Sequence, residues 1–177
     1  AIFDVKKLNW INSEYEKKLA EENPREVWEF AGMPKVFDIV GVTGTTVFAG
    51  RLEKMSDIKK MDYLWEDKEP EYEKDLLIWK NSDKERTKNA LEKTKDVLSS
   101  KIELEIFDEK YIRKELDDLA QKEFGGDRGA VYWPLRVALT GQEKSPDPVE
   151  IMSIFVKESK DPEKIFTRVD KALEKLR

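Results

Sequence analysis

The stretch DEKYIRKELDDLAQKEFGG, residues 108–126, decides the fold class expected for this chain. Asp108 carries the acceptor side chain that favours a helix start, and the apolar residues after it recur at helical spacing. These apolar residues are Ile112, Leu116, Leu119 and Phe124. The pair Gly125-Gly126 can adopt the left-handed backbone of a helix end. The stretch therefore predicts one amphipathic helix with its own start and stop signals.

Similar signals recur through the last two thirds of the chain. Ser82-Asp83-Lys84-Glu85 has the pattern of a capping box. Ser145-Pro146 and Asp161-Pro162 each place a capping oxygen before a proline at the first helical position, which predicts two more helix starts. Before these two pairs, residues 133–139 form an apolar helical series that we expect to stop at Gly141.

The first third of the chain is more ambiguous. Residues 36–48 are rich in Val and Thr and favour a strand on propensity alone. However, Asp4, Asn23-Pro24 and Ser56 each precede an apolar series at helical spacing. An isolated short hairpin would be hard to place among these helices, so we interpret this third as helical as well.

A domain boundary is expected in the acidic, proline-containing stretch from Glu66 to Tyr72. We therefore predict an all-α fold with two small helical subdomains, residues 1–66 and 67–177. The amino terminus lacks a methionine and runs directly into a patterned segment, and we interpret the chain as a fragment.

Composition excludes several classes of function. The 33 Lys and Arg residues nearly balance the 38 Asp and Glu residues, so any contact with nucleic acid must come from local patches. The absence of histidine and cysteine excludes hydrolytic triads, zinc fingers and disulfides. The longest mostly apolar stretch, residues 36–49, is far shorter than the roughly 20 residues of a membrane helix. We expect a soluble, cytoplasmic protein without a signal peptide.

Three strings resemble the carboxy-terminal anticodon-binding region of bacterial-type, class I glutamyl-tRNA synthetases, over roughly residues 3–176. FDVKKLNWINSEY, residues 3–15, is similar to the family form FDxxKLxWxNxxY, which follows the catalytic lysine loop. WPLRVALTG, residues 133–141, resembles the motif PLRxALTG, and SPDPVEI, residues 145–151, resembles the turn that follows it. RLEKMSDI, residues 51–58, is similar to an arginine-containing helix of the family.

The resemblance implies that this chain reads the anticodon of tRNA(Glu) and is separated from the catalytic half of a glutamate–tRNA ligase. That half is a Rossmann domain with HIGH and KMSKS sequences. A chain without histidine cannot contain HIGH, and we interpret Lys54-Met55-Ser56-Asp57 as a chance partial match to KMSKS. The fragment itself is expected to be non-catalytic and to need no cofactor, whereas the parent protein uses ATP, Mg and glutamate.

The same resemblance nominates five residues for RNA contact. Arg136, Ser145, Pro146 and Pro148 would face the first two anticodon bases, and Arg51 would read the third. An arginine only donates hydrogen bonds, which suits the O2 and N3 acceptors of cytosine better than the N–H donors of guanine. The alternatives are structural: Ser145 and Pro146 cap a helix, Arg136 forms a buried ion pair, and Arg51 is a solvated charge.

Two other classes of function are open to the sequence. The charged faces could belong to a helical protein-interaction or scaffolding module without RNA binding, and a tRNA titration would distinguish it. A small self-contained enzyme is disfavoured by the missing histidine, cysteine and glycine-rich loops. As the leading hypothesis we expect a monomer that binds tRNA(Glu) and neither DNA nor membranes. We expect most of its five tryptophans to lie in the core.

Overall fold

The computed structural model describes residues 4–49, 51–52, 55–80, 82–102 and 107–177. Contacts divide the chain into two compact units, unit 1 (Ala1–Glu66) and unit 2 (Asp67–Arg177). Among the described residues every regular element is helical, which confirms the all-α prediction. The assignment of the two units as anticodon-binding subdomains stays a prediction. Phe3, Glu53 and Lys54 of the strings quoted above lie outside the described residues.

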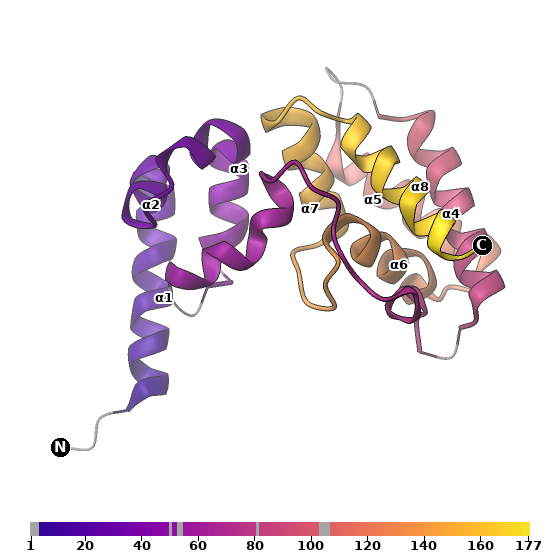
Figure 1. Ribbon diagram of the computed structural model, residues 1–177, viewed down its shortest axis with the longest axis horizontal. Helices are drawn as coiled ribbons and strands as arrows, with labels where there is room; N and C mark the ends of the chain where they lie inside the picture. Colours follow the sequence, from indigo (N-terminus) through magenta and orange to yellow (C-terminus); the bar gives the residue numbers. More distant parts are fainter. Residues whose placement is uncertain (1–3, 50, 53–54, 81, 103–106) are drawn as a thin grey trace. The chain divides into compact units, whose positions relative to one another are not determined.

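The described residues of unit 1 form α-helices and 3-10 segments (Figure 1). Its elements are α1 (Val5–Glu22), α2 (Pro24–Phe30), η1 (Pro34–Val36), α3 (Phe37–Ala49) and η2 (Met55–Leu64). Asp4 caps α1 as predicted, because its side chain accepts hydrogen bonds from the backbone N–H groups of Lys6 and Lys7. Pro24 begins α2 as predicted, but the side chain of Asn23 does not cap the helix. Helices α1, α2 and α3 pack against one another.

The core of unit 1 is centred on Trp28, which is fully buried. Its indole N–H donates a 2.7 Å hydrogen bond to the hydroxyl of Thr45. The rings of Phe48 and Trp65 meet it edge to face, with centroids 6.4 Å and 5.5 Å away. This arrangement satisfies the polar atom of a buried tryptophan while its ring fills the core.

The β-branched stretch that favoured a strand is helical in the structure. Helix α3 breaks at Gly41, whose φ of 59° and ψ of −161° are not helical. The hydroxyl of Thr45 donates to the carbonyl of Gly41 at 2.7 Å. Burial of Val40 and Phe48 in the core of unit 1 thus outweighs the weak strand preference of the valines and threonines.

The prediction that Arg51 lies on a helix is wrong. Arg51 lies in a turn after α3, where its backbone N–H donates to the carbonyl of Phe48 at 2.7 Å. Its guanidinium Nη1 donates to the carbonyl of Val47. Both contacts satisfy carbonyls that a helix leaves without partners at its carboxy-terminal end, so Arg51 terminates α3. The segment after it is the 3-10 element η2, which is itself interrupted at Met61.

Unit 2 is organised around α6. Its elements are η3 (Lys74–Leu77), α4 (Lys84–Ser99), α5 (Glu109–Glu123), α6 (Arg128–Thr140), α7 (Pro148–Ser153), the π-helical turn η4 (Ile154–Glu158) and α8 (Glu163–Lys175). Helices α4, α5, α7 and α8 and the segment η3 all pack against α6. Most of the side chains of α6 are therefore buried. We refer to residues 68–80, which lead into α4, as the strap.

Aspartates begin the helices of unit 2. Asp108 caps α5 as predicted. Asp161 accepts from the backbone N–H of Lys164, but the N-cap of α8 is Pro162, so this helix begins one residue later than predicted. The predicted capping box at Ser82 is wrong, because Asp83 caps α4 by accepting from the N–H of Arg86 at 2.7 Å. A carboxylate interacts more strongly than a hydroxyl with the positive end of a helix.

Candidate nucleic-acid interface

The candidate interface in unit 2 is the junction between α6 and α7, residues 141–147. Helix α6 stops at Gly141, whose φ of 70° is left-handed as the sequence predicts. The N–H of Gly141 donates to the carbonyl of Val137 at 2.7 Å. The hydroxyl of Thr140 donates to the carbonyl of Arg136 and accepts from the N–H of Gln142. These bonds satisfy the last turn of α6 and fix where the chain leaves it.

The residues that start α7 differ from the prediction. The N-cap is Asp147 and the first helical residue is Pro148, so Ser145-Pro146 does not cap the helix. Asp147 accepts from the N–H of Val149 at 2.9 Å, and its own N–H donates to the side chain of Glu150 at 3.1 Å. The second oxygen of Asp147 forms a 2.8 Å ion pair with Arg113 of α5. This reciprocal box, absent at Ser145, explains why the helix begins two residues later.

The predicted residues Ser145 and Pro146 lie in this junction, and Pro148 follows it as the first residue of α7. The hydroxyl of Ser145 is half-buried and donates to the carbonyl of Pro146 at 2.9 Å. Both prolines are buried. Their geometry suits a rigid turn that holds neighbouring groups in place, while the oxygen of Ser145 retains acceptor capacity.

Arg136 lies one turn before the end of α6 and is half-buried. Its Nε atom is buried and has no hydrogen-bond partner among the described residues, and the side chain forms no ion pair with any of them. The alternative of a buried ion pair is therefore not what this part of the structure shows. A buried donor without a partner costs about 1–3 kcal/mol, so an acceptor brought by a bound molecule would be stabilised here.

Arg51 belongs to unit 1, whereas the other four predicted residues belong to unit 2. Its side chain is exposed at the end of α3. The sequence prediction thus covers one arginine near the end of α6, three residues at or just before the start of α7, and one arginine in the other unit.

Two supports of the junction were missed from the sequence. Arg168 of α8 is buried, and its Nη1 donates to the carbonyl of Leu139 in the last turn of α6 at 2.5 Å. The strap also touches the junction, since a Cβ atom at Gly141 would lie 3.1 Å from the Cβ of Pro70 and 3.2 Å from the carbonyl oxygen of Glu71. An arginine on an amphipathic helix and a helix-ending glycine carry no sequence signal for such long-range contacts.

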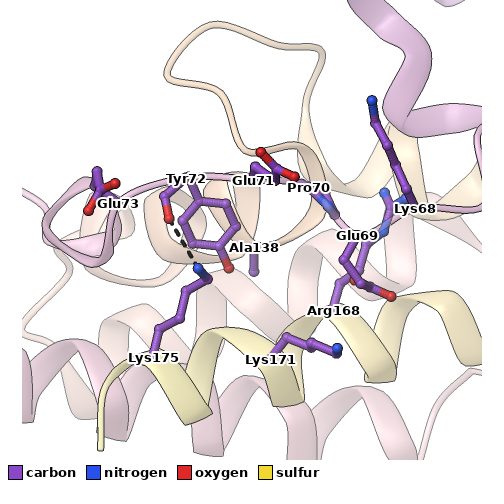
Figure 2. A pocket seen from close by; sticks show the side chains of 10 residues that line it. All are labelled: Lys68, Glu69, Pro70, Glu71, Tyr72, Glu73, Ala138, Arg168, Lys171 and Lys175. Atoms are coloured by element: carbon purple, nitrogen blue, oxygen red, sulfur yellow. Dashed lines mark hydrogen bonds between the residues drawn. The ribbon is translucent and has the colours of Figure 1, made fainter.

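A cavity of about 720 Å³ opens between the strap and α8 (Figure 2). It is lined by Lys68, Glu69, Pro70, Glu71, Tyr72, Glu73, Ala138, Arg168, Lys171 and Lys175. The ammonium group of Lys175 donates to the carbonyl of Tyr72 at 3.2 Å and lies 5.0 Å from the centre of its ring. Burial, and then the carboxylate of Glu69, raise the pKa of Tyr72 to about 12. Four cationic side chains face three carboxylates, so the lining offers no strong excess of either charge.

The fate of the tryptophans differs along the chain. Trp28 is core, as expected, and Trp133 is held by a 2.8 Å hydrogen bond from its indole to the carbonyl of Leu76 in the strap. The ring centroids of Trp79, in the strap, and Trp133 lie 5.0 Å apart. Trp10 is largely exposed and departs from the expected core position.

The described residues contain no group of three or more His, Cys, Asp or Glu side chains that could hold a metal ion. Within the same residues no helix is both long and apolar enough to cross a membrane.

The two units define an all-α protein with its candidate interface at helix termini. The chain belongs to the anticodon binding domain family, whose model matches residues 8–173. It is similar to a protein named Glutamate--tRNA ligase from Clostridium botulinum, with 30% identity over the whole chain and 36% of that protein. A second protein of this name, from Clostridium tetani, is 32% identical over the whole chain and 35% of its own length. The chain thus spans about a third of the relatives it matches.

The crystal structure of a glutamate tRNA ligase from Elizabethkingia meningosepticum, in complex with its amino acid, has a similar fold. The TM-score is 0.67 at 18% identity, and the match covers 99% of this chain and 33% of that one. At this identity the likeness shows the fold alone. The predicted family and fold class are confirmed, and the chain corresponds to the anticodon-binding part of these relatives.

Proposed function

We propose that this chain recognises the anticodon of tRNA(Glu) within a longer glutamate–tRNA ligase, which we call the parent protein. The observation that carries the proposal is the half-buried Arg136, one turn before the end of α6, whose Nε has no hydrogen-bond partner among the residues that the structure describes. Because the chain belongs to the anticodon binding domain family, an anticodon base is the acceptor that we expect for this donor. Anticodon bases expose their hydrogen-bonding edges when they are splayed out of the loop.

In this proposal Arg136 and the hydroxyl of Ser145 contact the first two anticodon bases. Pro146 and Pro148 act by holding the turn rigid, since both are buried and neither has an N–H to offer. The hydrogen bond from Arg168 to the carbonyl of Leu139 fixes the last turn of α6. In this proposal it also holds Arg136 in position when RNA binds. Preorganisation of this kind reduces the entropy lost on binding.

Arg51 supplies the reading of the third base. Its position at the end of α3 leaves it exposed, and one of its guanidinium nitrogens donates to the carbonyl of Val47. A guanidinium only donates hydrogen bonds, so it matches the O2 and N3 acceptors of cytosine and opposes the donors of guanine.

Catalysis belongs, in this proposal, to the part of the parent protein outside this chain. ATP, Mg²⁺ and glutamate would bind there, because this chain spans about a third of its relatives and its sequence contains no HIGH motif. The parent protein would act in the cytoplasm, in translation.

The test is a titration of the chain with tRNA(Glu) at several salt concentrations. We expect affinity to fall with salt, because lysines and arginines displace counterions. Arg136→Gln should weaken binding roughly 5- to 150-fold, by analogy with the about 1–3 kcal/mol of a two-donor base contact in DNA. The matched control is Arg128→Gln on the same helix, where the guanidinium pairs with Asp117 at the surface.

Two outcomes would contradict the proposal. Equal affinity for tRNA(Glu) and for an unrelated hairpin of the same size would remove anticodon reading. Absence of any RNA binding by the folded chain would instead favour a helical protein-interaction module. A change in Arg128→Gln as large as in Arg136→Gln would mean that the effect is general electrostatics.

A further inference from the structure

The first half of α1 exposes an unusual number of large apolar side chains. Leu8 is 39%, Trp10 63%, Ile11 48% and Tyr15 61% exposed. Residues spaced by three and four positions share a face of a helix, so Leu8, Ile11 and Tyr15 form one stripe. Trp10 precedes Ile11 and lies roughly 100° around the helix from it, at the border of this stripe. We call these four residues the α1 face.

The second half of the same helix is covered within unit 1. Leu19 and Ala20 are buried, as is Glu16, and α1 packs against α2 and α3. Figure 1 shows that the first half of α1 extends beyond α2 and α3. The described residues of unit 1 therefore bury one half of α1 and leave the α1 face open.

Single exposed apolar residues need no explanation, but a contiguous group of four on one helix marks an interaction surface. Three occupants are conceivable: a second copy of the chain, a separate protein, or the rest of the parent protein. A stable interface between free-standing proteins engages roughly 20–30 residues a side. The α1 face alone is too small for that.

A binding surface that is covalently joined to this chain does not need an interface of this size. Covalent linkage raises the effective concentration to the millimolar range for a short linker, so a small apolar contact is enough. The chain spans about a third of its relatives, which leaves most of a longer protein to supply that occupant.

We propose that the α1 face is the surface on which unit 1 docks against an apolar surface of the parent protein outside this chain. This inference rests on the proposed membership in a longer ligase. Docking through α1 buries Trp10 and Tyr15 and ties the orientation of unit 1 to the rest of the enzyme.

Hydroxyl-radical footprinting tests the proposal, because it reports the solvent exposure of individual aromatic side chains. Modification of Trp10 and Tyr15 is compared between the chain alone and the full-length parent protein. We expect at least a fivefold lower rate for both in the full-length protein. Phe30 of α2 and Tyr111 of α5 are exposed controls and should change less than twofold. Equal rates for Trp10 and Tyr15 in the two proteins would overturn the proposal.

A dilution series of the chain alone tests whether a second copy of the chain covers the α1 face. Protection of Trp10 that grows with concentration would assign the α1 face to self-association and overturn docking. Rates that are independent of concentration support the tethered occupant.

Ile11→Glu in the full-length protein provides a second readout. The buried carboxylate should open the contact and return Trp10 and Tyr15 to the modification rates of the chain alone. Val42→Glu, at an exposed position of α3, is the matched control and should leave the protection intact. Protection that survives Ile11→Glu would show that the α1 face is not the contact.

These experiments distinguish a failure of the docking proposal from a failure of the proposed anticodon recognition. If the chain binds tRNA(Glu) but Trp10 stays exposed in the full-length protein, docking is wrong and the proposed function stands. If Trp10 is protected but Arg136→Gln binds tRNA normally, the role of Arg136 is wrong and docking stands.

Discussion

The two units achieve helical structure in different ways. In unit 2, aspartate side chains bond to the first turns of α4, α5, α6 and α7, so each helix carries its own start signal. In unit 1, α3 is broken at Gly41 and η2 at Met61, and the pieces are held by the core around Trp28. Stability in unit 2 is therefore spread over caps and a central helix, whereas in unit 1 it depends heavily on one aromatic cluster.

The strongest test of this comparison is Trp28→Ala. Removing a fully buried tryptophan should cost about 3–5 kcal/mol, and the loss should fall on unit 1. Hydrogen exchange under increasing urea, resolved by peptide, measures the opening of each unit. Trp10→Ala, at an exposed position, should change the free energy of unfolding of the isolated chain by about 0.5 kcal/mol or less. Equal destabilisation of both units by Trp28→Ala would show that they unfold as one.

Gly141→Ala tests how tightly the strap supports the junction in unit 2. A left-handed residue with a Cβ costs about 1–2 kcal/mol, and crowding against Pro70 and Glu71 adds about 1–3 kcal/mol. Gly125→Ala is the matched control, because its φ of 66° is also left-handed but no atom lies within 4 Å of the new Cβ. The difference between the two in thermal unfolding isolates the strap contact. No difference would mean that the strap yields freely.

Arg51→Gln tests whether unit 1 takes part in reading. The amide can turn its acceptor toward guanine, so preference for a C-ending over a G-ending anticodon should relax by roughly 5- to 150-fold, or about 1–3 kcal/mol. Aminoacylation of tRNA(Glu) and of its C-to-G variant by the full-length protein is the measurement. Arg25→Gln is the control, since that arginine pairs with Asp38 at the surface of unit 1. An unchanged ratio in Arg51→Gln would leave reading to unit 2 alone.

Alkaline pH should weaken unit 2 through two tyrosines. Burial is the main cause that raises the pKa of both Tyr72 and Tyr132 to about 12. A folded pKa above the unfolded value near 10 means that the protonated phenols stabilise the fold below that pH, and that this contribution is lost as the pH rises toward 12. A double Tyr→Phe variant at these positions should show a shallower alkaline loss in urea unfolding. An identical pH dependence in both proteins would contradict the assignment.

Unit 1 should respond at the opposite end of the scale. Burial, and then the nearby Asp57, raise the pKa of Glu16. Its protonated form therefore stabilises unit 1 below the unfolded pKa, and the contribution is lost as the pH rises through the folded pKa. Glu16→Gln should reduce the acid-side gain in the stability of unit 1, measured by the same peptide-resolved exchange. As the pH is lowered from 7, the stability of unit 1 should therefore rise more in the original chain than in the Glu16→Gln variant.

Much of the fold followed from local sequence signals, because caps and helix stops act within a few residues. Asp4, Asp108 and Gly141 behave as their chemistry predicts. The errors arose where two local options compete, as at Ser82 and Asp83, or where a signal lies two residues early, as at Ser145. Family strings supplied the candidate site, since neither charge nor spacing could distinguish Arg136 from any other arginine.

The sequence by itself determined that this is an all-α chain without the histidine or cysteine of a hydrolytic triad or a zinc finger, and that it resembles an anticodon-binding domain. Tertiary structure decided the rest: that Arg51 ends a helix, that Arg168 and the strap support the junction, and that Trp10 stays outside the core. The physical reason is range. Helix starts and stops depend on neighbours along the chain, whereas burial and partners of a side chain depend on residues brought close only by folding.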